Sequence, residues 1–192
     1  QLTAALLQAS QQIDLTNVQV ILFPPFTHLA AMRQLLPASG PLYLGAQDCH
    51  AQASGAFTGE VAASMLQAVG AQFVLIGHSE RRQYGGEDSR LLAQKVTTAL
   101  VHGLRPIFCC GESQQHRVRG QGQSEALVIQ QLQDGLFHLT GAQLAQVAIA
   151  YEPVWAIGTD QVPSPTQVQT MHQAIRHAIA LHYDEEVAQG LP

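Results

Sequence analysis

The chain alternates short, almost continuously apolar segments with longer amphipathic ones, and this order constrains its fold more than any other feature. Strands as apolar as these are typical of a parallel sheet covered on both faces. We expect strands at residues 18–23, 42–46, 73–77, 106–110 and 146–151. We expect helices at residues 2–12, 29–36, 60–69, 89–102, 124–136 and 166–182. Repeated strand-then-helix order indicates an α/β fold.

Two architectures fit this order, a doubly wound open sheet and a closed eight-stranded barrel. The residues that follow the strands favour the barrel. Polar or conformationally restricted residues come directly after five predicted strands: Pro24 and Pro25, Gln47 and Asp48, His78 to Glu80, Gly111 and Glu112, and Glu152. A barrel builds its active site from all of its strand ends, whereas an open sheet concentrates ligand-binding groups at one switch point.

Composition excludes several classes of function. Apolar residues make up 46% of 192 residues, enough for one domain spanning residues 1–192. The net charge of −5 provides no basic footprint for nucleic acid, and no apolar run approaches the roughly 18 residues of a membrane span. The three cysteines are odd in number and two are adjacent, so they suit no disulfide framework. We therefore expect a cytoplasmic protein without a membrane anchor.

Residues 150–159 place one carboxylate, Glu152, at the end of an apolar strand. Pro153 stops the strand, and Gly158 gives the following segment backbone freedom. A carboxylate beside a closing lid fits a general base that removes a proton while water is excluded. The alternative is a carboxylate that pairs with an arginine at the strand end.

A second strand-end motif, Ile-Gly-His-Ser-Glu-Arg-Arg, occupies residues 76–82. A short helix beginning after His78 would point backbone N–H groups at its ring. The chain has nine histidines and no His-Glu-x-x-His pattern, so a metal site is not expected. The alternative for His78 is a structural or surface role.

Six ordered motifs resemble the triosephosphate isomerase family, which folds as a (β/α)8 TIM barrel. They run from about residue 20 to about residue 183, at residues 23–27, 45–49, 55–60, 76–82, 109–112 and 150–159. These segments look like the family's second to sixth strands, its dimer loop and its lid. The resemblance implies an isomerase of glycolysis and gluconeogenesis that interconverts dihydroxyacetone phosphate and D-glyceraldehyde 3-phosphate through an enediolate. It implies no cofactor and no metal.

The resemblance assigns the principal roles to specific residues. Glu152 would be the general base, and a neutral His78 would donate to the enediolate oxygens. The N–H of Gly158 would bind the substrate phosphate. The lid would comprise Trp155, Ala156, Ile157, Gly158 and Thr159.

Further residues receive supporting roles by the same resemblance. Ser79, Glu80 and Cys109 would lie close to the site, with packing as the favoured role for Cys109. The residue matching Thr58 reaches into the partner subunit of a homodimer. Arg81 would brace the dimer loop against Glu60. The alternatives are a plain turn residue at Thr58 and an exposed ion pair at Glu80 and Arg81.

The chain departs from the family pattern in three respects. An Asn-x-Lys at the first strand has no counterpart, since Lys95 falls within a predicted helix and Asn17 precedes a strand. Nor do a seventh strand, a Gly-Gly-Ser loop and an eighth strand follow residue 192. We expect a barrel incomplete in this chain, with further segments in the molecule. The alternative is a catalytically inactive fragment that keeps the dimer loop. Asp160 and Pro163 also change the far end of the lid.

A third function, that of a Schiff-base aldolase on another phosphosugar barrel, is disfavoured by the position of Lys95. Such an enzyme needs a lysine at a strand end to form the imine. Lys95 is the single lysine of the chain and falls within a predicted helix.

Overall fold

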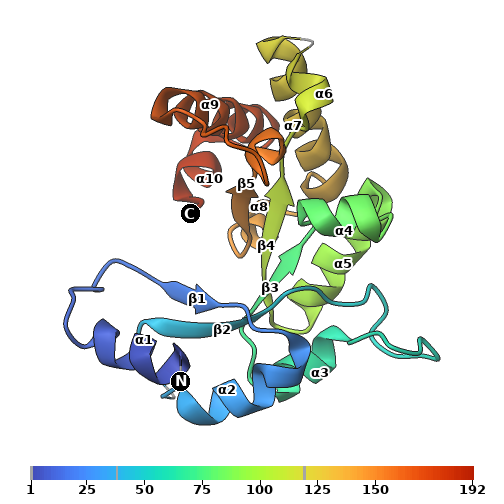
Figure 1. Ribbon diagram of the computed structural model, residues 1–192. Helices are drawn as coiled ribbons and strands as arrows, with labels where there is room; N and C mark the ends of the chain where they lie inside the picture. Colours follow the sequence, from blue (N-terminus) through green and yellow to red (C-terminus); the bar gives the residue numbers. More distant parts are fainter. Residues whose placement is uncertain (1, 38, 119) are drawn as a thin grey trace.

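The computed structural model describes residues 2–37, 39–118 and 120–192. Its centre is a parallel five-stranded sheet whose strands follow one another in sequence order. The strands are β1 (Val20–Leu22), β2 (Leu42–Ala46), β3 (Phe73–Ile76), β4 (Arg105–Cys110) and β5 (Ala148–Tyr151). Figure 1 shows the sheet curling from β1 and β2, which run across the lower half, to β3 and β4, which rise through the upper half. This curled half-barrel confirms the α/β prediction.

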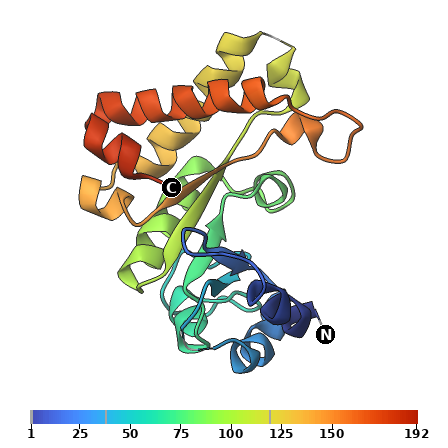
Figure 2. The same cartoon turned by 90° about the vertical axis from the view of Figure 1, so that its left-hand side faces the viewer.

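Helices cover the outside of the curl. The long ones are α5 (Ser89–Val101), α7 (Gln121–Leu136) and α9 (Pro165–His182). The shorter ones are α1 (Leu2–Ser10), α2 (Leu29–Leu35), α3 (Ala63–Ala68), α4 (Ser79–Tyr84), α6 (Gln114–Arg117), α8 (Gly141–Leu144) and α10 (Glu185–Gly190), with 3-10 turns η1 (Phe26–His28) and η2 (Val154–Ala156). Helix α5 packs on β3 and β4, and α7 packs on β4, α5 and α9. Figure 2 shows α9 and α7 stacked above the sheet and α1 and α2 at its lower end.

The core lies between the sheet and these helices. Phe108 on β4 is fully buried, and it reaches α7 where that helix carries Gly135. A Cβ at position 135 would come within 2.3 Å of the Phe108 ring, so the absence of a side chain lets the helix approach the strand. Leu92 from α5 and Leu132 from α7 are also fully buried. These buried side chains belong to the core between the sheet and helices α5 and α7.

Most predicted elements are confirmed, with shifted ends. The strand at residues 42–46 has the predicted bounds. The helix expected from residue 60 begins only at Ala63, because Ala62 is extended and bridges to His50. Helix α9 begins at Pro165, where Ser164 and Gln167 form a capping box. The short helices α6, α8 and α10 were not predicted, because they have too few residues for a periodic pattern.

In the part of the chain that the structure describes, no helix has the length and hydropathy that crossing a bilayer requires.

Candidate active site

The carboxyl ends of β3, β4 and β5 meet at one rim of the sheet and carry the predicted catalytic residues. His78 follows β3 after Gly77, which takes a positive φ of 77°. Glu152 follows β5 directly, and its N–H donates to the carbonyl of Cys110 over 2.8 Å. The register pairs Cys110 with Tyr151, the residue before Glu152. Parallel pairing therefore brings together two residues that are 74 positions apart in the chain.

The structure places Glu152 in direct contact with His78. The Nε2 of His78 lies 2.9 Å from Oε1 of Glu152. The other carboxylate oxygen, Oε2, accepts the backbone N–H of Ser79 over 3.0 Å. The carboxylate is thus held between a ring nitrogen and a helix N-terminus, and both of its contacts come from the turn that begins α4.

The ring of His78 is oriented by the helix that it caps. Its Nδ1 accepts the N–H of Glu80 over 3.3 Å, so His78 is the N-cap of α4. A ring nitrogen that accepts an N–H carries no proton, which leaves the proton on Nε2. That tautomer is neutral, and it points its one N–H at Glu152. Glu80 itself is largely exposed, with Oε2 3.8 Å from Nδ1.

The environment of Glu152 raises the pKa of its carboxyl. Burial has the largest effect and raises the pKa, since the charged form loses solvation. Attraction to His78, the Ser79 N–H and the charge of Arg82 oppose this effect, and Glu80 adds to it. The net direction is upward from the ordinary value for glutamate. A carboxylate with a raised pKa accepts a proton more readily than an ordinary one.

The end of β4 is fixed against Glu152 by a glycine and a glutamine. A Cβ at Gly111 would lie 1.8 Å from the carbonyl oxygen of Glu152, so only glycine allows this approach. Gln131 from α7 clamps Gly111 with both of its amide atoms. Its Nε2 donates to the Gly111 carbonyl over 3.0 Å, and its Oε1 accepts the Gly111 N–H over 2.9 Å.

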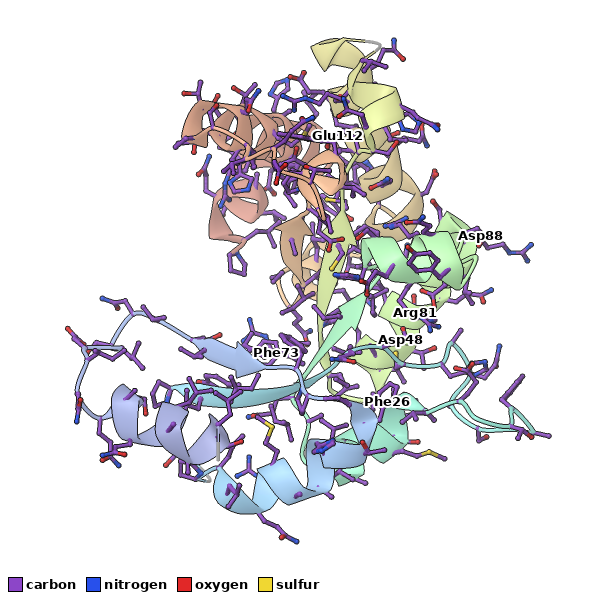
Figure 3. The ribbon with its side chains drawn as sticks, viewed as in Figure 1. Phe26, Asp48, Phe73, Arg81, Asp88 and Glu112 are labelled. Atoms are coloured by element: carbon purple, nitrogen blue, oxygen red, sulfur yellow. The ribbon has the colours of Figure 1, made fainter. Side chains whose placement is uncertain are left out.

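The predicted lid begins on a buried anchor. Trp155 is 4% exposed, and its Nε1 donates to Oε1 of Glu112 over 2.9 Å. Tyr151 donates to the same oxygen over 3.0 Å. The guanidinium of Arg117 lies 3.6 Å from the Trp155 ring centroid. The first turn of the segment is therefore fixed. Figure 3 shows Glu112 in the upper part of the molecule, beside α9.

The remainder of the predicted lid is exposed. Ile157 is 52% exposed, and Gly158 has a positive φ of 70° with nothing near its missing Cβ. Thr159 turns back on the segment, donating from Oγ1 to the Ala156 carbonyl over 3.0 Å. Few contacts hold this tip, which fits a segment that closes over a ligand.

A buried charge network lies below α4. Lys95, 2% exposed, contacts Asp48 and Glu87 over 2.7 Å each. Arg81 contacts Asp48 over 2.9 Å and Glu87 over 2.6 Å. Figure 3 shows Asp48 and Arg81 side by side there. Burial is the main cause of a raised pKa for Asp48, partly offset by Lys95.

This network differs from the expectation for Arg81. The family resemblance predicts that Arg81 braces the loop against Glu60, whereas in the structure Arg81 forms ion pairs with Asp48 and Glu87. Glu60 adds a weaker attraction, the smallest of the effects on the pKa of Arg81. The loop carrying Thr58 and Glu60 is exposed. Asp48, two residues after β2, and Glu87 thus each link Arg81 to Lys95.

Cys109 is 2% exposed on β4, and burial raises the pKa of its thiol. It therefore packs as an uncharged side chain. Among the described residues, no group of three or more histidine, cysteine, aspartate or glutamate side chains could hold a metal ion.

Sequence reasoning gave no role to three residues that shape this site. Arg82 and Gln131 bond to backbone at the strand ends, and Glu112 holds Trp155. Arg82 lies within the motif at residues 76–82, and Glu112 follows a predicted strand. Gln131 had no local signal, because its partner is 20 residues away in the chain.

Comparisons with known proteins agree on one family. The family model described as triosephosphate isomerase matches residues 1–192. A triosephosphate isomerase of Amoebophilus asiaticus is 46% identical over 191 residues, which cover 100% of this chain and 75% of that protein. One of Chloroflexus aurantiacus is 48% identical over 175 residues, 91% of this chain and 69% of that protein. One of Herpetosiphon aurantiacus is 45% identical over 178 residues, 93% and 70% of the two chains.

Proposed function

Because this chain belongs to the triosephosphate isomerase family, we propose that Glu152 and His78 are the residues that move protons in its reaction. The chain is an isomerase that interconverts dihydroxyacetone phosphate and D-glyceraldehyde 3-phosphate through an enediolate. Such a reaction needs a base that removes a proton from carbon and a donor to the adjacent oxygens. One observation carries the assignment, the 2.9 Å contact between His78 Nε2 and Glu152 Oε1.

The contact supports a specific division of labour. The Glu152 carboxylate, with its pKa raised by burial, removes the carbon-bound proton. The Nε2–H of neutral His78 donates to the enediolate oxygen. In the structure, the His78 and Ser79 N–H groups each contact one of the two carboxylate oxygens. When substrate binds, its oxygen must replace Glu152 as the partner of the His78 N–H, and the carboxylate must move to the substrate carbon that carries the proton.

Closure of the segment from Trp155 to Thr159 over the substrate completes the proposal. The N–H of Gly158 would bind the phosphate group, and the closed segment would keep water from the enediolate. The buried Trp155 is the fixed end of this movement, because Glu112 and Arg117 hold it. Glu80 and Cys109 support the site from nearby without contact to the reacting carbon.

The same proposal extends to assembly and compartment. We propose a homodimer formed through the loop at residues 49–60, which is exposed from residue 52 onward, with Thr58 at the partner's site and Arg81 behind the loop. The three cysteines are free and buried, which fits a reducing compartment such as the cytoplasm.

Replacing Glu152 by glutamine tests the base. The amide keeps the size and the acceptor for Ser79 but cannot take up a proton. We expect the rate of solvent deuterium incorporation into dihydroxyacetone phosphate, followed by proton NMR, to fall by about 10²–10⁴-fold. The matched control is Glu186→Gln on the exposed face of α10, which should keep the rate. A Glu152→Gln variant within a few-fold of the unsubstituted chain would overturn the assignment.

A further inference from the structure

Arg82 bridges the ends of two strands that carry the proposed catalytic residues. Its Nε donates to the Gly77 carbonyl over 2.7 Å, and its Nη2 donates to the Cys109 carbonyl over 2.8 Å. Gly77 directly precedes His78. Cys109 is paired in register with Ala150, two residues before Glu152. We propose that Arg82 is a positioning residue that fixes the distance between His78 and Glu152 by tying together the ends of β3 and β4.

The bridge requires the geometry of an arginine. A guanidinium presents donors in several fixed directions, so one side chain reaches carbonyls on two strands. Lysine has one nitrogen at a single point and cannot span both positions in the same way. The surroundings fit the guanidinium closely. A Cβ at Gly77 would lie 2.9 Å from Nη2 of Arg82, so the glycine leaves the space that this group occupies.

Arg82 also places a positive charge behind the base. Its guanidinium carbon lies 5.5 Å from the ring centroid of Phe108, which is fully buried. Within the described ranges, no carboxylate lies within ion-pair distance of Arg82, unlike its neighbour Arg81. Two carbonyl dipoles solvate the charge instead. The net positive charge therefore acts on Glu152, where it favours the ionised form.

The two effects give Arg82 a role that packing alone would not. Holding two carbonyls keeps the strand ends at a fixed separation while the Glu152 side chain leaves His78 for the substrate. A misplacement of about 1 Å between reacting groups costs on the order of 10²-fold in rate. Among the described residues, the other titratable groups that act on Glu152 are His78 at the N-cap of α4, Glu80 on α4 and the thiols of Cys109 and Cys110 on β4.

The inference rests on the proposed roles of His78 and Glu152, so its test includes a readout that does not need turnover. The variants are Arg82→Lys, which keeps the positive charge but loses the planar set of guanidinium donors, and Arg82→Gln, which loses both the charge and those donors. The matched controls are Arg105→Lys and Arg105→Gln. Arg105 stands at the opposite end of β4 and lies over the Phe73 ring at 5.0 Å, as Arg82 lies over Phe108.

The first measurement is NMR of the substrate-free chain. The Nε2 proton of His78 reports its bond to Glu152, and the carboxyl carbon of Glu152 reports its pKa. We expect both Arg82 variants to weaken the Nε2 signal, and Arg82→Gln alone to raise the pKa of Glu152 clearly. Both Arg105 variants should leave these signals as in the unsubstituted chain.

The second measurement is steady-state kinetics. We expect kcat to fall about 10–100-fold in both Arg82 variants, with KM changed less than threefold and the Arg105 variants near the unsubstituted rate. Unchanged NMR signals and kcat in the Arg82 variants, or equal losses in the Arg105 variants, would overturn the positioning role. So would a failure of both Arg82 variants to fold, since Arg82 would then be structural. Failure of the proposed function is separate, since it appears as undiminished exchange in Glu152→Gln.

Discussion

At the scale of single residues, the site is defined by which atom carries which proton. The N–H of Glu80 points at Nδ1 of His78, so the ring donates from Nε2. In its half-buried position, Glu152 accepts that donor through one carboxylate oxygen and the Ser79 N–H through the other. Both interactions come from the first turn of α4. A single helix start thus prepares the donor and orients the base.

The pH dependence of the reaction follows from Glu152. Its carboxyl must be ionised to accept a proton, and burial raises its pKa above the ordinary glutamate value. We expect kcat/KM to fall with decreasing pH through a transition that lies above the ordinary range of glutamate. Measurement of kcat/KM across pH 4–9 locates this limb. An acid limb at or below the pKa of a free glutamate side chain, about 4.3, would contradict the prediction.

The same shift has a consequence for stability. A carboxyl whose pKa is higher in the folded state than in the unfolded state binds its proton more tightly when folded. The stabilisation that this carboxyl gives to the folded state is fully present at a pH below its pKa in the unfolded chain. It is lost as the pH rises through its pKa in the folded chain. Glutamine does not titrate, so the Glu152→Gln variant does not lose this stabilisation. Its free energy of unfolding, compared with that of the unsubstituted chain, should therefore rise as the pH increases from the unfolded-state pKa of Glu152 to its folded-state pKa.

At the scale of elements, the buried network joins α4, α5 and the end of β2. Lys95 from α5 meets Asp48 after β2, and Arg81 on α4 meets the same carboxylate. Glu87, in the connection between the two helices, contacts both Arg81 and Lys95. The network therefore contains two cations and two carboxylates. Such a balanced network contributes little net stability, but the loss of one member leaves a buried charge unpaired.

Replacing Lys95 by methionine tests this network. Two buried carboxylates would remain with Arg81 alone, and we expect the free energy of unfolding to fall by about 3–5 kcal/mol. The loss should shrink as pH falls, because protonation of Asp48, whose pKa burial raises, removes one of the unpaired charges. Urea denaturation at pH 5 and pH 8 measures both effects. Arg90→Met, at an exposed position of the same helix, should change stability by less than about 0.5 kcal/mol.

At the scale of the whole molecule, the five strands form a curl with two unpaired edges, at β1 and β5. The same molecule exposes large apolar side chains on the loop at residues 49–60 and on helices α3 and α4. Phe57 is 44% exposed, Met65 58% and Tyr84 79%. Exposed apolar residues of this size favour association with another surface. A second copy is the partner that we propose for the loop.

Replacing Thr58 by arginine tests the dimer. An arginine brought into the partner's site is larger than threonine and loses the hydration of its charge, and both effects disfavour association. We expect the dissociation constant, measured by sedimentation velocity, to rise about tenfold or more, equivalent to about 1.4 kcal/mol. Leu181→Lys removes a 75% exposed side chain on α9 and should leave association unchanged. A chain that sediments as a monomer at all concentrations would contradict the proposed dimer.

The sequence determined the order of elements and the position of the site within it. The apolar segments fixed five strands, since strands buried on both faces need uninterrupted apolar residues. The motifs at residues 76–82 and 150–159 marked His78 and Glu152 as candidates, because the strand ends of a barrel form its active-site face. Resemblance to a family then supplied the reaction. These features are local, so they can be read along the chain.

The tertiary structure decided which residues meet. It brought Arg82 to the carbonyl of Cys109, Gln131 to Gly111 and Lys95 to Asp48, pairs separated by 27, 20 and 47 positions. It also paired Arg81 with Asp48 and Glu87, whereas the family resemblance predicted a contact with Glu60. Such pairings depend on the register of neighbouring strands and on how each helix lies on them. No local pattern contains that information, because hydrogen-bond partners are set by distance in space.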